Sequence, residues 1–481
     1  MECNSLHRRL SARHIAMIAI GGSIGSGIFV ASGTAIHTAG PGGALLAYLI
    51  MSMMVYFLMT SLGEMSTLLP TTGSFCDYAT RFVDPAFGFA MSYNYWLNWA
   101  VTTAVDLSAA ALIIHTWVPE ISFFAWTVIF FVLIVLMNIV PVAFYGEMQY
   151  WFSGIKVAAV ILFILIGIFV ILGIVGHQKP LDWTNWTIDD APFHSGWVGF
   201  MSVLMIAGFS FQGTEIFGIT AGETKDPTTS IPKAVRNVFW RIVIFYILTM
   251  GIISFLVPYN NPLLIVASTT NVGASPFTII LQMAGLHFAQ VTMTIVILLA
   301  ILSAANASMY TAARTLWHIA REGNAPRFLM TTSKRHGIPI AALVLTSIIS
   351  AAVFLSSQVG SGQLFVWLLN ISSLTGFIAW FGIALCHYRF RKAYLAQGRK
   401  LSDLPYLAKG FPFGSIFALV LCVFVIAGQQ FDAWILHNVN LDNLIGTYIG
   451  LPIFMMFYLG FKFWNRTKLI PLTECSFKPE M

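Results

Sequence analysis

The sequence predicts an all-α integral membrane protein with twelve transmembrane helices, and three observations support this fold class. Of the 481 residues, 58% are hydrophobic and only 9% are charged, which excludes an ordinary soluble domain. Apolar runs of about 20 residues, enough to cross the hydrocarbon core as a helix, recur along the chain. Basic residues gather at alternate ends of these runs. We expect helices because unpaired backbone groups in lipid cost several kcal/mol each.

The expected spans follow one another with short connections. In chain order they cover residues 15–39, 42–69, 87–117, 122–142, 148–176, 195–221, 235–258, 276–303, 339–356, 361–388, 412–430 and 444–464, and the eighth continues as a helix to about residue 322. The first apolar run belongs to the fold, so we expect no cleavable signal peptide.

The basic residues predict the orientation. With a cytoplasmic N-terminus, 23 of the 25 Lys and Arg residues fall on the cytoplasmic side, and only Lys156 and Lys179 do not. Both termini are therefore expected to be cytoplasmic. The net charge of +6 is explained by these topology signals without a nucleic-acid partner. The five cysteines, Cys3, Cys76, Cys386, Cys422 and Cys475, show no paired spacing and are expected to be free thiols.

Two polar, glycine-containing interruptions divide the chain into repeats. GGSIGSGIF, Gly21 to Phe29, interrupts the first span, and GFSFQGTE, Gly208 to Glu215, interrupts the sixth. The interruptions open two consecutive repeats of five spans each, and because five is odd the second repeat must be inverted. Broken helices at matching positions of inverted repeats indicate the central site of a transporter. The expected divisions are a tail (1–13), a first repeat with its outer loop (14–194), a second repeat (195–388), two further helices (389–465) and a second tail (466–481).

Other readings of these glycines remain open. Gly21-x-x-x-Gly25 fits the small-xxx-small pattern by which membrane helices pack closely, with no ligand involved. A nucleotide-binding loop is disfavoured, because no strand precedes the glycines and no βαβ unit follows them.

Three acidic residues and Lys156 lie inside the expected spans and are not explained as topology signals. A charge near the middle of a bilayer costs roughly 2.5–3.5 kcal/mol on insertion-based scales, so such residues usually face a cavity or a partner. Glu215 directly follows the second interruption and is expected beside the cavity. Lys156 either snorkels to the interface or holds the inner end of the first span and titrates. Asp106 either lines the cavity or serves a structural hydrogen bond, and Glu64 is expected at a helix end or gate.

One face of the third span carries a stripe of aromatic and polar residues. Tyr95, Trp99, Thr102 and Asp106 stand at helical spacing, with Asn98 close by. Such stripes often serve packing or form interface belts. Ring faces together with a carboxylate would also suit an organic cation. The histidines show no metal-binding spacing, and no nucleophile–base pattern appears, so we expect no enzyme.

Several segments resemble bacterial amino-acid permeases of the amino acid–polyamine–organocation superfamily. They are ARHIAMIAIGGSIGSGIFVASG, AGPGGALLAYLI, SLGEMSTLLPTTGSF, FGFAMSYNYWLNWAV, GFSFQGTEIFGITAGETKDPTTSIPKAVRNVFWRI, FVWLLNISSLTGFIAW and HYRFRKAY. Within that superfamily, the chain is most similar to the proton-coupled lysine-specific permeases. The resemblance covers nearly the whole chain. It implies a five-plus-five inverted repeat, with helices 1 and 6 unwound at mid-membrane, and two extra helices.

The resemblance also implies roles for particular residues. The substrate carboxylate would meet the first interruption, and its ammonium would meet carbonyls of the second. The residues concerned are Ser23, Ile24, Gly25, Ser26 and Gly27, then Phe209, Ser210 and Phe211. Tyr95, Asn98, Trp99, Asp106 and Glu215 would form the rest of the cavity, and Lys156, Glu215 and Glu223 would couple a proton.

These roles imply L-lysine import by proton symport across a bacterial inner membrane, without a metal, a sodium ion or any other cofactor. One departure is the segment LLIVASTTNVGASPF, which carries no acid where close relatives are expected to have aspartates. Open alternatives are another substrate (arginine, histidine or a neutral or aromatic amino acid) and a transporter that also senses amino acid through a regulatory membrane-protein partner. A channel is disfavoured, because no ring of charges or repeated filter appears.

Overall fold

The computed structural model describes residues 24–71, 73–176, 180, 182–216, 218, 226–264, 275–333, 337–429 and 441–478, and every regular element within them is a helix. This confirms the all-α prediction. The longer helices are α2 (Ser32–Leu68), α4 (Pro85–Trp117), α5 (Phe123–Asn138), α6 (Val142–Ile171), α7 (Gly196–Phe211), α9 (Pro227–Arg241), α13 (His287–Arg321), α14 (Ile340–Ser350), α16 (Ser361–Ala396), α17 (Phe413–Ala427) and α20 (Gly450–Asn465). The shorter ones are η1 (Gly27–Ala31), α3 (Phe75–Phe82), η2 (Thr184–Trp186), η4 (Ile242–Leu248), α10 (Thr249–Leu256), α12 (Pro276–Met283), η5 (Arg327–Met330), η6 (Ala351–Leu355), α15 (Ser356–Val359), η7 (Leu401–Asp403) and α19 (Leu441–Tyr448).

The helices have the length and composition of membrane spans. Seven helical stretches in the described part of the chain are long and apolar enough to cross a bilayer, and three further apolar helices are shorter. The seven are Gly27–Leu68, Pro85–Trp117, Phe144–Ile171, Pro227–Leu256, His287–Arg321, Ile340–Val359 and Ser361–Ala396. The division into twelve spans and two inverted repeats stays a prediction.

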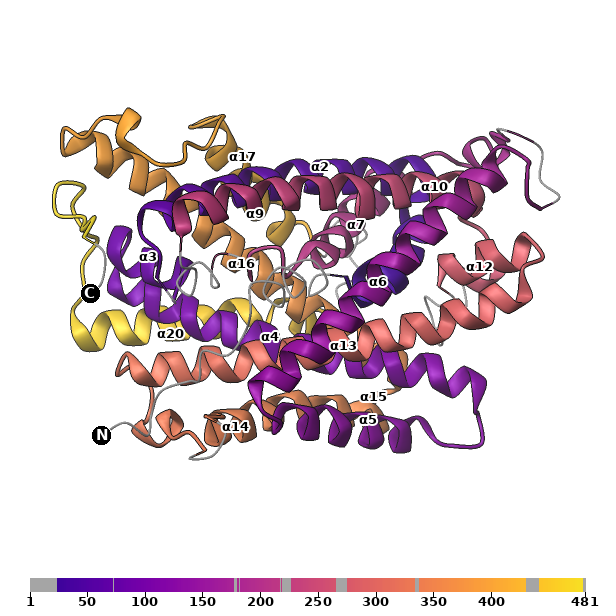
Figure 1. Ribbon diagram of the computed structural model, residues 1–481, viewed down its shortest axis with the longest axis horizontal. Coiled ribbons are helices and arrows are strands. Elements are labelled where there is room, and N and C mark those ends of the chain that lie inside the picture. The colour runs from indigo at the N-terminus through magenta and orange to yellow at the C-terminus, as the bar shows by residue number, and fades with distance from the viewer. Residues whose placement is uncertain are drawn as a thin grey trace.

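The bundle is organised around α4. Figure 1 shows α4 and α13 extended along the long axis of the molecule, and α4 packs against both α13 and α16. Of the most apolar stretch of α4, 89% is buried inside the protein. By contrast, many aliphatic and aromatic side chains of α5, α6 and α17 are exposed, as expected of helices that face lipid. Residues of α4 are therefore well placed to line an internal site.

The first two expected spans are joined without a loop. Gly40 interrupts α2 with φ 72° and ψ 176°, a conformation that only glycine adopts readily, and Pro41 follows it. The amides of Gly42 and Gly43, which have no helical partner beyond the break, both donate to the carbonyl oxygen of Pro192, at 2.9 and 3.2 Å. The loop before α7 therefore caps the start of the second span.

That same loop carries an exposed, hydrogen-bonded carboxylate. The Tyr259 hydroxyl donates to Asp190, and the His194 ring lies 2.7 Å from the same carboxylate and stacks on Tyr259. These hydrogen bonds, the one from Tyr259 first, lower the pKa of Asp190 to about 2. Because the pKa is lowered, the stabilisation by Asp190 is present at neutral pH and is lost only as the pH falls toward about 2.

Non-helical backbone occurs in the described part of both predicted interruptions, residues 24–29 and 208–215. Ile24 and Gly25 are not helical, and the chain enters a π-helix at η1 before continuing as α2. At the other interruption α7 ends at Phe211, and Gln212 (ψ 146°) and Gly213 (φ 90°) turn the chain away from the helix axis. The break thus follows Phe211 instead of falling on Phe209–Phe211, which form the last turn of α7.

The two interruptions pack directly on each other. A Cβ atom added to Gly27 would lie 2.5 Å from the Ser210 Cα, a distance that forces the backbones apart. A Cβ atom at Gly25 would meet the Ala304 side chain of α13 at 2.9 Å. Glycine is therefore required at position 27 by a backbone-to-backbone approach, which agrees with the close-packing reading and with the site reading alike.

This contact yields a first prediction. Gly27→Ala should abolish the uptake of labelled L-lysine, the expected substrate, into proteoliposomes. The reason is that the added methyl group displaces the end of α7 from the start of the first helix. The matched control is Gly251→Ala in α10, where the added atom meets nothing within 4 Å and uptake should stay near normal. Normal uptake by the Gly27 variant would show that this approach is not needed.

Candidate functional site

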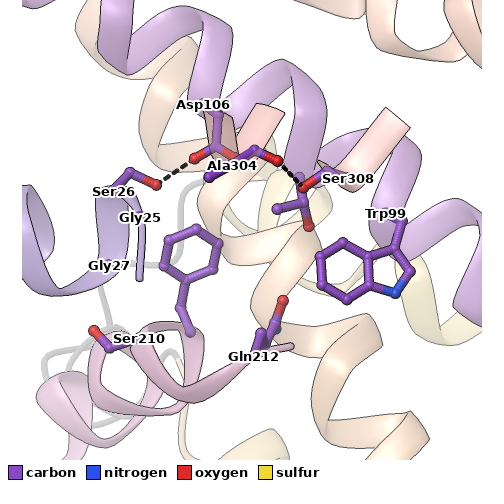
Figure 2. A pocket seen from close by; sticks show the side chains of 11 residues that line it. Gly25, Ser26, Gly27, Trp99, Asp106, Ser210, Gln212, Ala304 and Ser308 are labelled. Atoms are coloured by element: carbon purple, nitrogen blue, oxygen red, sulfur yellow. Dashed lines mark hydrogen bonds between the residues drawn. The ribbon is translucent and has the colours of Figure 1, made fainter. Parts of the chain in front are cut away.

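A small cavity lies where the two interruptions meet α4 and α13. Its walls come from four parts of the chain, and Figure 2 shows most of the lining side chains converging on one space. The lining residues are Gly25, Ser26, Gly27, Trp99, Thr102, Asp106, Phe209, Ser210, Gln212, Ala304 and Ser308. Its volume is about 30 Å³, room for roughly two or three water molecules at about 10–15 Å³ each. Any larger ligand must enter by a movement of these walls.

Asp106, on α4, connects the first interruption to α6. The Ser26 hydroxyl donates to the Asp106 carboxylate at 2.5 Å, which Figure 2 shows as a dashed line. Lys156 of α6 interacts electrostatically with the same carboxylate. Asp106 and Lys156 are both almost fully buried, with exposures of 2% and 1%. The fold therefore brings together a carboxylate and an ammonium that are expensive in a membrane when unpaired.

Glu215 is buried close to the cavity but is not one of the residues that line it. Gly213 N donates to its carboxylate at 3.1 Å, the Trp380 indole N–H at 3.3 Å, and the Tyr95 hydroxyl lies 3.5 Å away. The buried guanidinium of Arg241, at the end of α9, also interacts with it electrostatically. Tyr95 packs edge-on against Trp99, so the cavity wall and the surroundings of Glu215 share an aromatic contact.

Asn98 holds the second interruption against α16. Its side-chain amide donates to the Ser372 carbonyl at 2.7 Å, to Thr375 at 3.0 Å and to Gln212 at 3.4 Å. Gln212 donates in turn to the Ser372 carbonyl at 2.9 Å. This network is buried, so each hydrogen bond is costly to lose. It fixes the side chain of Gln212, which lines the cavity.

The comparisons with known proteins now decide the family. The family model described as amino acid permease matches residues 14–471. The chain belongs to the amino acid permease family. A lysine-specific permease of Escherichia coli is 48% identical to this permease over 99% of the chain and 97% of its own length. Its counterpart in Lactococcus lactis is 47% identical over 97% and 92%, and a histidine permease of that organism is 46% identical over 99% of both.

Solved structures show the fold. A manganese transporter of Eremococcus coleocola matches 97% of the permease and 98% of its own chain, with a TM-score of 0.55 and 14% sequence identity. At that identity the likeness concerns the fold alone. It confirms a transporter-type helical membrane fold for the permease, and the relatives, being permeases, confirm that it is not an enzyme. Within the described residues, no group of three or more His, Cys, Asp or Glu side chains is placed to hold a metal ion.

The residues expected at the site fall into three groups. Gly25, Ser26, Gly27, Trp99, Asp106, Phe209 and Ser210 line the cavity. Ile24, Tyr95, Asn98, Lys156, Phe211 and Glu215 are buried without being among the lining residues. Ser23 and Glu223 lie outside the described residues, as does most of the segment LLIVASTTNVGASPF.

Glu64 lies away from the cavity in an ion pair with Arg391. The Arg391 guanidinium donates to both of its oxygens, and the Ala408 amide donates at 2.6 Å. His387 lies 3.5 Å from the same carboxylate. The cluster joins the second expected span to α16 and to the segment before α17.

The four described cysteines, Cys76, Cys386, Cys422 and Cys475, are free thiols, as predicted.

Four residues of the permease site escaped the sequence reasoning. Gln212 stands in the quoted GFSFQGTE segment, so its place beside the break was a usable signal. Ser308 belongs to an ordinary apolar span and carries no such signal, whereas Trp380 ends the quoted FVWLLNISSLTGFIAW segment without any spacing that marks it. Arg241 was counted as a cytoplasmic topology residue, yet it is only 4% exposed.

The buried amide network gives a second prediction. Asn98→Ala should lower the free energy of unfolding by about 1–3 kcal/mol, because it leaves the Ser372 carbonyl and Gln212 with fewer partners in a buried place. Thermal unfolding of the purified permease in detergent measures the change. Thr116→Ala is the control, since Thr116 is exposed on the same helix and its hydroxyl bonds only to the Ile113 carbonyl. Equal unfolding temperatures for the two variants would contradict the role of Asn98.

Proposed function

We propose that this permease imports L-lysine together with a proton by alternating access. The observation that carries the proposal is the Glu215 carboxylate, which is 2% exposed and lies behind the cavity beside Tyr95 and Trp380. The α-ammonium that every amino acid carries is assigned below to the end of α7, so a neutral amino acid has no second cation to match a buried carboxylate. The second positive charge of lysine supplies one. The lysine-specific relatives support the same assignment.

The backbone of a zwitterionic substrate needs an anion site and a cation site close together. At the first interruption, the helix dipole at the start of η1 favours a carboxylate, and no side chain of the described residues caps this end. At the second, the last carbonyls of α7 face the same cavity from the negative end of a helix. We assign the substrate carboxylate to Ile24–Gly27 and its α-ammonium to Phe209–Phe211.

The substrate side chain would then point toward Glu215. Trp99 and Gln212 separate the cavity from the layer that holds Glu215, and both belong to the cavity wall. If the walls move apart when substrate enters, an extended side chain can pass between them. Its terminal ammonium would lie beside Glu215 and the ring of Tyr95, which together suit a cation. The histidine permease among the relatives favours histidine as the second candidate, because it also carries a cation when protonated.

Proton coupling would use two buried acid–base pairs. Asp106 is matched with Lys156, and Glu215 with Arg241. Binding of a proton or a cationic substrate changes the net charge of one pair. This changes the electrostatic attraction between the helices that carry the pair, and so the position of the cavity walls. We propose that Lys156 and Glu215 change partners between outward- and inward-facing states. Glu223, in the expected inner end of the sixth span, would receive the proton on the cytoplasmic side.

The membrane orientation belongs to the proposal as well. The distribution of Lys and Arg supports cytoplasmic termini in a bacterial inner membrane. A regulatory membrane-protein partner beside transport is part of the same proposal. Members of this family generally work without a cofactor, and we propose that the proton gradient alone drives uptake here.

Substrate choice is tested by competition. Uptake of labelled lysine into proteoliposomes should be suppressed by unlabelled lysine far more than by the other nineteen amino acids. Glu215→Gln should remove most lysine uptake, because it deletes the charge while keeping the size of the side chain. If unlabelled histidine suppressed this uptake more strongly than unlabelled lysine, histidine would be the preferred substrate. Full lysine uptake by Glu215→Gln would show that Glu215 does not bind the side-chain ammonium of the substrate.

Coupling is tested at Lys156. Lys156→Ala should uncouple transport, so that lysine exchange continues while an imposed proton gradient no longer drives accumulation. Lys392→Ala is the control, because Lys392 is exposed at the end of α16 and contacts only the ring of Tyr388 among the described interactions. Gradient-driven accumulation by the Lys156 variant at the wild-type level would contradict its role in coupling.

A further inference from the structure

The C-terminal segment, Arg466–Lys478, binds back onto the helical bundle. It follows α20, whose last helical residue is Asn465, and Arg466 reverses the chain with φ 50°. Figure 1 shows this segment, coloured yellow, at the same end of the molecule as α3. The end of α20 is itself fixed, since Lys462 donates to Asp84 at the start of α4. The segment is therefore directed onto a defined surface.

That surface is formed by the ends of α3 and α16, and backbone hydrogen bonds fix the register. The Ile470 amide donates to the Val83 carbonyl at 3.0 Å. Arg389 of α16 donates both to the Phe82 carbonyl and to the Ile470 carbonyl, so one guanidinium joins α16, α3 and the segment. Further along, Gln397 donates to the Leu472 and Cys475 carbonyls at 3.1 and 2.8 Å.

An aromatic anchor completes the contact. Phe477 is 8% exposed, and its ring centroid lies 5.4 Å from Phe82, 5.4 Å from Phe390 and 5.2 Å from Tyr394. The Arg399 guanidinium covers the same ring at 4.7 Å. A buried aromatic residue with matched hydrogen bonds on either side is the arrangement of a specific docking site.

The helix held in this way reaches the candidate site. Phe75 and Phe82 lie seven residues apart on one face of α3. The Phe75 ring packs edge-on against Tyr95 at 4.9 Å, and the Tyr95 hydroxyl approaches Glu215. At the other end of the same helix, Phe82 contacts Phe477. A tilt of α3 would therefore change two contacts together, that of Phe82 with the C-terminal segment and that of Phe75 with Tyr95 beside Glu215.

We propose that residues 470–478 are a strap that holds α3 against the site and restrains opening of the cavity toward this end of the bundle. The cavity has room for only roughly two or three water molecules, so a substrate can leave only when its surroundings move. α3 is also joined to its neighbours by Asp77 and His318, a pair separated by 3.7 Å, and by the Tyr78 hydroxyl, which donates to the Leu69 carbonyl at 2.6 Å. Release of the strap removes one of these restraints and favours opening.

Cys475 reports the position of the strap without any added label. Its thiol belongs to the strap and is 3% exposed when the strap is docked. In purified full-length permease, the rate of its alkylation by a maleimide, followed by mass spectrometry of the peptide, measures undocking. Phe477→Ala should raise this rate by about tenfold or more, because the anchor is lost. Phe463→Ala, an aromatic truncation at a 76% exposed position of α20, is the matched control and should leave it unchanged.

Transport decides whether the strap restrains the mechanism. This part rests on the proposed transport function, whereas the alkylation readout does not, so the two can fail separately. Phe477→Ala should raise the rate of lysine exchange in proteoliposomes at least about twofold, and saturating lysine should change the alkylation rate of wild-type Cys475. Faster alkylation with unchanged exchange, or alkylation that ignores lysine, would overturn the proposal. If Phe477→Ala fails to fold, Gln397→Ala removes only two hydrogen bonds to the strap and is judged by the same outcomes.

Discussion

The close approach of the two helix interruptions is the contact on which the rest of this structure depends. Gly27 meets the backbone of Ser210 with no space for a side chain, and the cavity opens directly beside this contact. Backbone amides and carbonyls freed in mid-membrane cost several kcal/mol each unless they find partners. Placing one free helix start against one helix end gives a single small space in which both kinds of group can be satisfied. A zwitterionic ligand is suited to such a space.

The charged residues are arranged around that contact in matched pairs. Asp106 bonds to Ser26 of the first interruption and interacts with Lys156, whereas Glu215 follows the second and interacts with Arg241. A change of charge in either pair can therefore alter the packing of the cavity walls. The α3 helix adds a mechanical connection, because it contacts Tyr95 at one end and the C-terminal strap at the other.

Local patterns were enough to predict the helical membrane fold, both interruptions and the buried charges. The stripe on α4 shows why: Trp99, Thr102 and Asp106 share one helical face by spacing alone, and all three line the cavity. Partners far apart in the sequence could not be predicted in this way. Glu64 pairs with Arg391, 327 positions away, and Trp380 reaches Glu215 from a span with no distinguishing pattern. Arg241 was assigned to topology because its burial depends on packing that periodicity does not encode.

The most direct test of this account is an experimental structure of the full-length permease with lysine bound in a lipid nanodisc. The account predicts the lysine α-carboxylate within hydrogen-bond distance of backbone amides of Ile24–Gly27, and its α-ammonium at the carbonyl end of α7. It further predicts the side-chain ammonium beside Glu215. A lysine whose carboxylate binds Arg241 or another side chain, with both interruptions still packed as they are here, would contradict it.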